Sequence, residues 1–240
     1  MREPLKILFK FPCKGRETMF FESLNSLNNN IRDKGNYHIS LTLDEDDLVL
    51  NRPEIKEVLS AYPNTSIEWG YSKSKVDAFN RNFPDYDWDL VIAWSQDFFA
   101  TMYGFDDIIR QYCYEINNRH GDDFLVHFPE PDSMEHLNVM YIATRKYYDR
   151  FGYIYHDSYK SLWCDNESYS VAKLLNKYHY VGILGLYEHR NAAYHKYQVE
   201  RDALFDEQQG HWQQDELNFN ERKARNFDLH LVLDIPQFKA

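Results

Sequence analysis

Hydrophobic and polar positions follow two alternating periods along this chain. Residues 5–11 are mostly apolar, with Lys6 and Lys10 among them, which predicts a strand. Downstream, apolar side chains return at steps of four, three and four positions, at Phe20, Leu24, Leu27 and Ile31. This spacing places them on one face of a helix. The N-terminal segment therefore predicts a strand followed by a helix.

The same strand-helix unit recurs through the first half of the chain. Further strands are predicted over residues 37–43, 65–69 and 89–94, and helices are predicted to begin near residues 53, 75 and 105. Repeated units of this kind favour a parallel sheet that is covered by helices.

The pattern becomes less regular after about residue 120. Strands are predicted over 124–128, 139–143, 181–186 and 228–233, and helices over 145–151, over 166–178 and within 194–227. No internal repeat or low-complexity linker interrupts the sequence. We therefore expect a single α/β domain.

Composition and charge limit the classes of partner. The 240 residues are 43% hydrophobic and 17% aromatic, as in a globular protein with a full core. The chain has 38 acidic residues and 27 Lys and Arg, so its formal charge is −11, which disfavours nucleic acid as the main partner. An α/β enzyme or binding module remains.

Cysteine usage and the apolar segments bear on location. Cys13, Cys113 and Cys164 are far apart and show no metal-binding spacing, as expected in a reducing compartment. We find no secretory leader and no apolar segment of membrane-spanning length. The sequence therefore predicts a cytoplasmic protein without a membrane span.

Carboxylates follow two of the predicted strands. Asp44 ends the second strand and Asp97 comes shortly after the fourth. Ligands of open parallel sheets bind beyond the carboxyl ends of the strands, so these acids, with Lys75 and Asn80, are candidates for a nucleotide crevice. The alternatives are a helix cap or solvated acid for Asp44 and a helix N-cap for Asp97.

A third acidic segment, residues 163–167, leads into a predicted helix. Asp165 and Glu167 are two positions apart and do not face the same way on a helix, so one of them is free for chemistry. We select Asp165, and the alternative is an N-cap of the following helix.

Together these segments resemble a known family. The ordered motifs Phe11–Arg16, Asp44–Asp47, Lys75–Asn80, Ser95–Asp97 and Trp163–Glu167 are similar to those of family 2 type glycosyltransferases of the GT-A fold, from Leu5 to about His189. The resemblance implies a Rossmann-type three-layer α/β/α sandwich with a mostly parallel sheet. It also implies a nucleotide-binding half (1–120), an acceptor and catalytic half (121–193), and a helical tail with a final strand (194–240).

The resemblance further implies a nucleotide-sugar donor, an acceptor with a free hydroxyl and a divalent cation, Mn²⁺ or Mg²⁺. Asp97 matches the last acid of the family's Asp-x-Asp motif and is the implied metal ligand. The first acid is absent, since Ser95 and Gln96 carry no charge. One carboxylate with phosphate oxygens and water still suffices for Mg²⁺. The implied nucleotide-binding residues are Pro12, Arg16, Asp44, Lys75, Asn80 and Gln96.

The remaining implied roles concern catalysis and the acceptor. Asp165 resembles the family's general base, which implies inversion at the sugar. His189 lies where many members place a histidine against the metal or the diphosphate, and its alternative is a structural histidine. Trp163 and Glu167 are the candidate acceptor contacts, and for Trp163 the alternative is core packing.

Two rival functions remain open at this point. A sugar nucleotidyltransferase shares such a crevice but needs a glycine-rich basic loop, for which the sequence offers only Lys14–Arg16. A non-catalytic nucleotide- or glycan-binding module has no need of Asp97 and Asp165.

Overall fold

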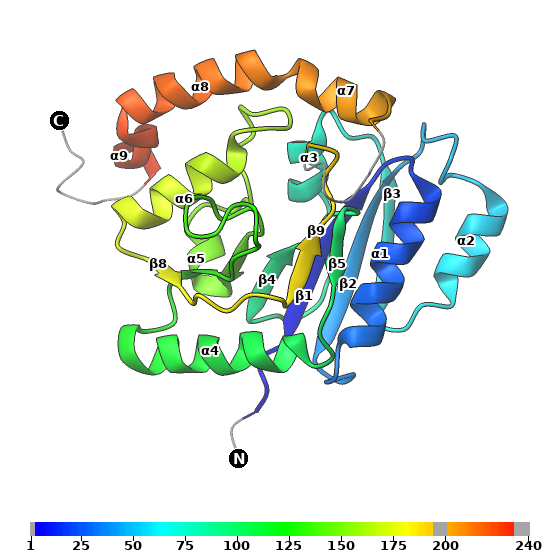
Figure 1. The fold of residues 1–240 in the computed structure, drawn as a ribbon, viewed down its shortest axis with the longest axis horizontal. Coiled ribbons are helices and arrows are strands. Elements are labelled where there is room, and N and C mark those ends of the chain that lie inside the picture. Colours follow the sequence, from blue (N-terminus) through cyan, green and yellow to red (C-terminus); the bar gives the residue numbers. More distant parts are fainter. Residues whose placement is uncertain (1–2, 194–200, 233–240) are drawn as a thin grey trace.

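The computed structural model describes residues 3–193 and 201–232, and within them a seven-stranded sheet forms the centre of the molecule (Figure 1). Its strand order is β3-β2-β1-β4-β7-β6-β8. The strands are β1 (Ile7–Cys13), β2 (Tyr37–Asp44), β3 (Thr65–Gly70), β4 (Leu90–Ala93), β6 (Leu125–His127), β7 (Ile142–Thr144) and β8 (Tyr178–Tyr180).

Most of the strand pairs in this sheet are parallel. β1 pairs in parallel with β2 and β4, and β2 pairs in parallel with β3. β7 runs antiparallel to both β4 and β6, whereas β6 and β8 are parallel. The four N-terminal strands therefore end at one edge of the sheet, as the sequence predicted.

Helices cover both faces of the sheet and cross its edge (Figure 1). The helices are α1 (Glu17–Asn30), α2 (Pro53–Ser60), α3 (Lys75–Asn80), α4 (Phe105–His120), α5 (Arg145–Asp149), α6 (Cys164–Leu174), α7 (Ala203–Gly210), α8 (Trp212–Ala224) and α9 (Leu229–Val232), with a 3₁₀ turn over Asn226–Asp228.

The core consists of two hydrophobic clusters, one on each face of the sheet. Successive strand residues point to opposite faces, so Phe9 joins the cluster under α1, α2 and α4. Leu8 joins the cluster under α3, α5, α6 and α8. This arrangement is the expected three-layer α/β/α sandwich.

A second, two-stranded sheet lies beside the main one. β5 (Phe98–Ala100) pairs antiparallel with β9 (Tyr187–His189), and Phe98 stands opposite His189. The pairing joins segments about ninety residues apart and brings the residue before β5 next to the end of β9.

Two predicted strands are wrong. Residues 181–186 form no strand, because Gly182 and Gly185 adopt positive φ angles of 73° and 85° that interrupt an extended ladder. Residues 226–232 are helical. Leu229 is buried and Leu231 is 76% exposed, so the alternating leucines that predicted a strand do not lie on one face. Leu233 lies outside the described residues, as do 194–200 of the predicted tail.

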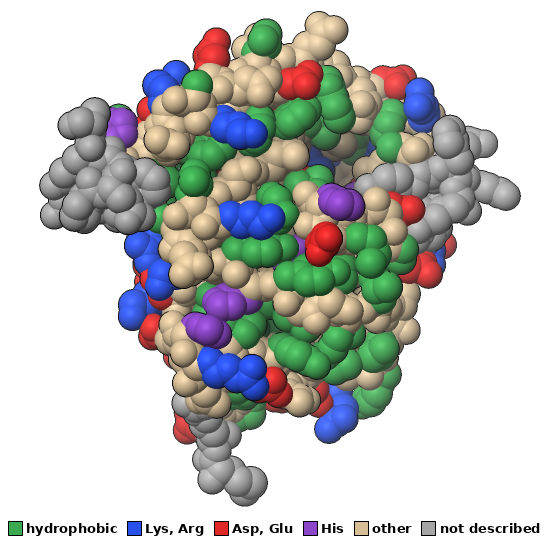
Figure 2. Space-filling view, turned by 60° about the vertical axis from the view of Figure 1, so that its left-hand side comes forward, with side chains coloured by type: hydrophobic (Ala, Val, Ile, Leu, Met, Phe, Trp, Pro, Cys, Tyr) green, Lys and Arg blue, Asp and Glu red, His purple; other side chains and the backbone are tan. Residues whose placement is uncertain are grey.

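Other boundaries differ by a few residues. β7 begins at Ile142 rather than Val139, and α6 begins at Cys164 rather than Asn166 and ends at Leu174. In residues 3–193 and 201–232, no helix has the length and apolar character needed to cross a bilayer. On the face shown in Figure 2, lysine and arginine side chains are scattered and form no continuous basic patch.

Candidate active site

Two neighbouring cavities lie beyond the carboxyl ends of β1, β2 and β4. The smaller has a volume of about 120 Å³ and the larger about 400 Å³. They share the lining residues Lys75, Ser95, Asp97 and Ser161. A ligand that extends from one cavity into the other therefore passes these four side chains.

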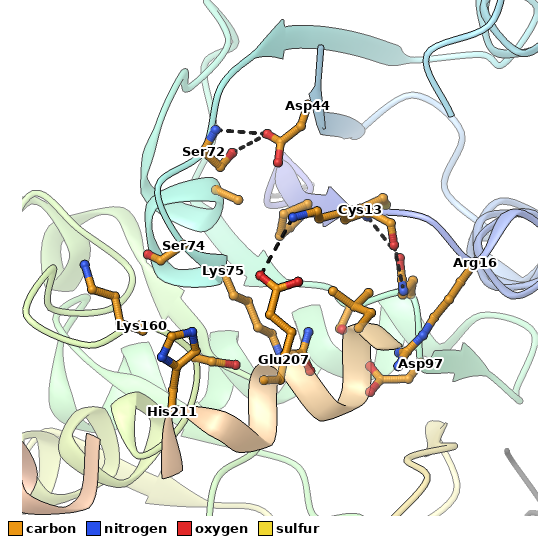
Figure 3. Close-up of a pocket in the computed structure, with 18 of the residues that line it drawn as sticks. Cys13, Arg16, Asp44, Ser72, Ser74, Lys75, Asp97, Lys160, Glu207 and His211 are labelled. Atoms are coloured by element: carbon orange, nitrogen blue, oxygen red, sulfur yellow. Dashed lines mark hydrogen bonds and ion pairs between the residues drawn. The ribbon is translucent and has the colours of Figure 1, made fainter. Parts of the chain in front are cut away.

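The smaller cavity collects five of the six predicted nucleotide-binding residues (Figure 3). They come from the end of β1, the turn into α1, the end of β2, the start of α3 and the loop after β4. These five residues are Pro12, Arg16, Asp44, Lys75 and Gln96.

Asp44 is fixed by a partly buried polar network. Its Oδ1 accepts hydrogen bonds from the Ser72 amide at 3.1 Å and the Ser72 hydroxyl at 2.6 Å, and it pairs with Arg81 at 3.1 Å. The cap position of the next helix, α2, is Arg52. Asp44 is therefore a cavity-lining residue whose side chain is held by hydrogen bonds, rather than a helix cap or a solvated acid.

Arg16 is turned toward the C-terminal segment. It adopts a left-handed backbone conformation (φ 46°) before α1, and its guanidinium pairs with Asp202 at 2.6 Å. Lys14 and Glu207 approach within 3.8 Å in the same region. The turn between β1 and α1 is thus attached to the segment that contains α7.

Asn80 has a different role from the one predicted. It is absent from the lining of both cavities. Its amide nitrogen donates to the Tyr155 carbonyl at 2.6 Å, and its Oδ1 accepts from the amides of Ile154 and Tyr155. Because these bonds occupy the side chain, Asn80 holds the 154–155 backbone in place and we assign it no ligand contact.

The larger cavity brings Asp97, Asp165, His189 and Trp163 together. The β5–β9 ladder explains why Asp97 and His189 are close together, since Asp97 directly precedes β5 and His189 ends β9. His189 Nε2 lies 3.3 Å from Asp97 Oδ2. The sequence separation of 92 residues hid this contact, although both residues were selected separately.

Asp97 stays ionised although it is only 8% exposed. Burial by itself raises its pKa, but the nearby His189 and Lys75 outweigh burial and hold the pKa well below its usual range. Its Oδ1 is buried and has no hydrogen-bond partner among the described residues. An ionised oxygen without a partner is suited to a cation or to a donor group on a ligand.

The donor set fits a divalent cation only with help from a ligand. Within residues 3–193 and 201–232, no three His, Cys, Asp or Glu side chains gather closely enough to hold a metal. Asp97 and His189 form a pair, and the buried Oδ1 of Asp97 is available. Mg²⁺ commonly takes one or two protein ligands and completes its shell with phosphate oxygens and water.

Asp165 is not the N-cap of its helix. α6 begins one residue earlier, at Cys164, after Trp163 in a left-handed conformation (φ 62°). Asp165 is partly exposed toward the larger cavity, and its Oδ1 accepts from the Asn166 amide at 2.9 Å. Burial raises the pKa of Asp165, while the Asn166 amide and Lys75 partly offset the rise.

Glu167 points away from the larger cavity and is 4% exposed. Its two oxygens pair with the Arg222 guanidinium at 2.7 and 2.8 Å, and it accepts from the Tyr159 hydroxyl at 2.7 Å. The predicted acceptor contact is therefore replaced by a buried link between α6 and α8. No local pattern indicates this link, because Arg222 is 55 positions away along the chain.

The C-terminal helices supply cavity walls whose individual residues were not selected from the sequence. The smaller cavity is lined on this side by Leu204, Glu207, Gln208 and His211, and the larger by Gln209 and Trp212. The loop before α6 also contributes, through Lys160 (Figure 3) and through Ser161. Only the aromatic content of the tail hinted at a contact with the rest of the domain.

The sandwich, with its cavities at the carboxyl edge of a mostly parallel sheet, is the GT-A fold of nucleotide-sugar glycosyltransferases. Staphylococcus aureus TarS (residues 1–349), in complex with UDP-GlcNAc, matches with a TM-score of 0.59 and 15% identity, over 85% of this chain and 64% of that chain. The mannosyltransferase PcManGT from Pyrobaculum calidifontis, in complex with GDP-Man and Mn²⁺, matches with a TM-score of 0.61 and 8% identity, over 77% of this chain and 56% of that chain.

At these identities the likeness defines the fold. The chain spans about 60% of the length of TarS 1–349. No protein-family model matches the sequence, and no curated protein matches it.

Proposed function

We propose that this protein is a metal-assisted, inverting glycosyltransferase that moves a sugar from a nucleotide-sugar donor to an acceptor hydroxyl. One observation carries the proposal: Asp97 and Asp165 line the same cavity, and Lys75 lies close enough to lower the pKa of both. One acid is held ionised and the other has a raised pKa, so they are prepared for different tasks.

The donor nucleotide occupies the smaller cavity in this proposal. Asp44 and Gln96 offer polar groups to the nucleoside, and Pro12 offers an apolar wall. The diphosphate then lies beside Lys75 and Asp97, where the two cavities meet. The nucleotide sugars in the complexes of the similar structures, UDP-GlcNAc and GDP-Man, support this class of donor.

Asp97 and His189 are the residues that would hold Mn²⁺ or Mg²⁺. When bound, the cation neutralises charge that develops on the departing nucleoside diphosphate. The Lys75 ammonium has no hydrogen bond or ion pair among the described residues, so it is available to a phosphate oxygen. Lys75 therefore adds a fixed positive charge at the same place.

Asp165 accepts the proton of the acceptor hydroxyl as its oxygen attacks the anomeric carbon. The carbon–oxygen bond to the nucleotide breaks as the new bond forms, and the diphosphate leaves on the opposite side, which inverts the configuration. The raised pKa of Asp165 makes it a stronger base than a solvated carboxylate.

The experiment is a nucleotide-release assay with a panel of UDP- and GDP-sugars, Mn²⁺ and candidate hydroxyl acceptors. We expect the wild type to release nucleoside diphosphate with at least one donor. Asp165→Asn should lower transfer by about 10²–10⁴-fold, because the proton has no base, and should leave nucleotide binding unchanged.

Asp157→Asn is the matched control, since the Asp157 carboxylate is 91% exposed and lines neither cavity. Absence of release from every donor would contradict the proposal. Transfer at the wild-type rate by Asp165→Asn would contradict the role of Asp165 as the base.

A further inference from the structure

The lining of the larger cavity divides into a charged part and an uncharged part. The described Lys, Asp and His side chains that line it are Lys75, Asp97, Asp165 and His189. Two of them, Lys75 and Asp97, also line the smaller cavity, so the charged part adjoins the proposed donor site. The larger cavity therefore has room for a second ligand beside the donor.

The rest of the described lining combines apolar and aromatic side chains with carboxamides. Three amides reach the cavity, from α6, from the segment after β9 and from α7: Asn166, Asn191 and Gln209. The apolar members are Phe79, Phe98, Leu137, Val139, Tyr155, Leu162, Trp163 and Trp212, with smaller side chains between them.

Trp212 is the most exposed aromatic wall of this cavity. It opens α8 and remains 46% exposed. Its ring centre lies 5.5 Å from that of Trp163 at an angle of 71°, and Trp163 in turn packs on Phe219 at 5.2 Å. The edge contact fixes the orientation of the Trp212 indole and leaves ring surface open to a ligand.

These features match the surface of a carbohydrate. A pyranose ring has an apolar face of C–H groups that packs on an aromatic ring, and hydroxyls at its edge. A carboxamide both donates and accepts, so it pairs with hydroxyls in either direction. The cavity volume of about 400 Å³ is in the range of small-molecule sites.

A charged acceptor fits this part of the cavity poorly. Lys75 is the only Lys or Arg in the described lining, and the proposed donor diphosphate lies against it. A phosphate or carboxylate on the acceptor would lose its hydration without gaining a partner of opposite charge. It would also lie near the carboxylates of Asp97 and Asp165.

We infer that the uncharged part of the larger cavity is an acceptor site for a neutral carbohydrate, with Trp212 as the stacking platform and Gln209 as a hydrogen-bonding residue. The inference deepens the proposed function and rests on it. Both residues flank the junction between α7 and α8, so the C-terminal helices supply the acceptor specificity.

The test is binding of the full chain, with UDP or GDP and Mn²⁺ present, to immobilised neutral glycans of hexose and N-acetylhexosamine units. Each glycan is paired with a phosphorylated or uronic-acid counterpart. We expect the neutral member to be retained in preference to the charged one. Trp212→Ala should weaken retention about tenfold, and Trp212→Phe should restore most of it.

Leu217→Ala is the control, since Leu217 lies on the same helix, is 58% exposed and lines neither cavity. Preference for the charged glycans, retention of no neutral glycan, or equal retention by Trp212→Ala would each overturn the inference. The rise in melting temperature with UDP or GDP is recorded on the same samples. A nucleotide effect without glycan retention contradicts only this inference, whereas no nucleotide effect contradicts the proposed function.

Discussion

Asp97 and Asp165 show how one residue type acquires two chemical characters within one cavity. The nearby His189 and Lys75 outweigh burial at Asp97, so the carboxylate is held in its charged form. Burial prevails at Asp165, which has no ion-pair partner among the described residues. Pairs of acids whose environments separate their pKa values are typical of sites that need both a permanent charge and a proton acceptor.

Sequence predicted the location of a residue well where position along a strand decides that location. Asp44 and Asp97 were selected because they follow parallel strands, and the sheet brings them to one edge. Prediction failed for Asn80 and Glu167, whose side chains are used by the Tyr155 backbone and by Arg222. Both partners are more than fifty positions away, and no local pattern reveals such contacts.

Lys10 is a buried charge outside the site that the sequence interpretation did not single out. It is fully buried on β1, where its ammonium contacts the Thr42 hydroxyl and the Asn82 carbonyl. Burial, with a smaller contribution from the nearby Arg81, lowers the pKa of Lys10 to about 7. The pKa of a lysine in an unfolded chain is about 10.4.

Lys10 predicts a pH dependence of stability. Between pH 7 and about 10 the unfolded chain binds more protons at this position than the folded one, so the free energy of unfolding should rise with pH. In Lys10→Met, the rise in the free energy of unfolding should be smaller than in the wild type by up to about 1.4 kcal/mol per pH unit, as measured by urea unfolding at several pH values. The exposed Lys223→Met is the control. Identical slopes for Lys10→Met and the wild type would show that Lys10 is not buried in its neutral form.

At the scale of elements, α8 holds the loop that precedes the proposed base. Asp215 is 1% exposed and accepts the backbone amides of residues 160, 161 and 162 at 2.9–3.0 Å. The same loop lines both cavities and continues into α6. One buried carboxylate therefore fixes three consecutive peptide groups at the entrance to the site.

Asp215→Ala should destabilise the protein strongly. Three amides lose a charged acceptor in a buried place, and each such bond contributes on the order of 1–3 kcal/mol. We expect a loss of about 3 kcal/mol or more in the free energy of unfolding by urea denaturation. The exposed Glu221→Ala on the same helix should change it by less than about 0.5 kcal/mol. Equal effects of the two variants would contradict the anchoring role.

Element type was predictable where a segment is long and its burial is regular. The N-terminal strands and α1, α2 and α4 were predicted in the correct order, because each directs regularly spaced apolar residues toward the core, although those of β3 are only partly buried. β8 and β9 contain three residues each, too few to show a period. The helical end of the described chain was mistaken for a strand because its apolar residues alternate over only a few positions.

At the scale of the whole molecule, α7 and α8 cross over the carboxyl edge of the sheet (Figure 1). The pair between Arg16 and Asp202 attaches this segment to the turn before α1, and the buried pair between Glu167 and Arg222 attaches it to α6. The helices were predicted from sequence. Their apolar and aromatic content favoured a tail that folds back on the domain, but the residues that dock it, which lie 55 and 186 positions apart along the chain, were not predicted.

The central claim is that Asp97 and Asp165 serve one reaction site in separate roles. It is tested most directly by the melting temperature of the wild type, Asp97→Asn and Asp165→Asn with UDP or GDP, with and without Mn²⁺. A ligand that binds only the folded state raises the melting temperature, by roughly 5–10 °C at about 100 times its dissociation constant for a protein of this size.

We predict that Mn²⁺ adds to the nucleotide-induced rise in the wild type and in Asp165→Asn, and that this added rise disappears in Asp97→Asn. An added rise that persists in Asp97→Asn, or that is lost in Asp165→Asn, would contradict the account.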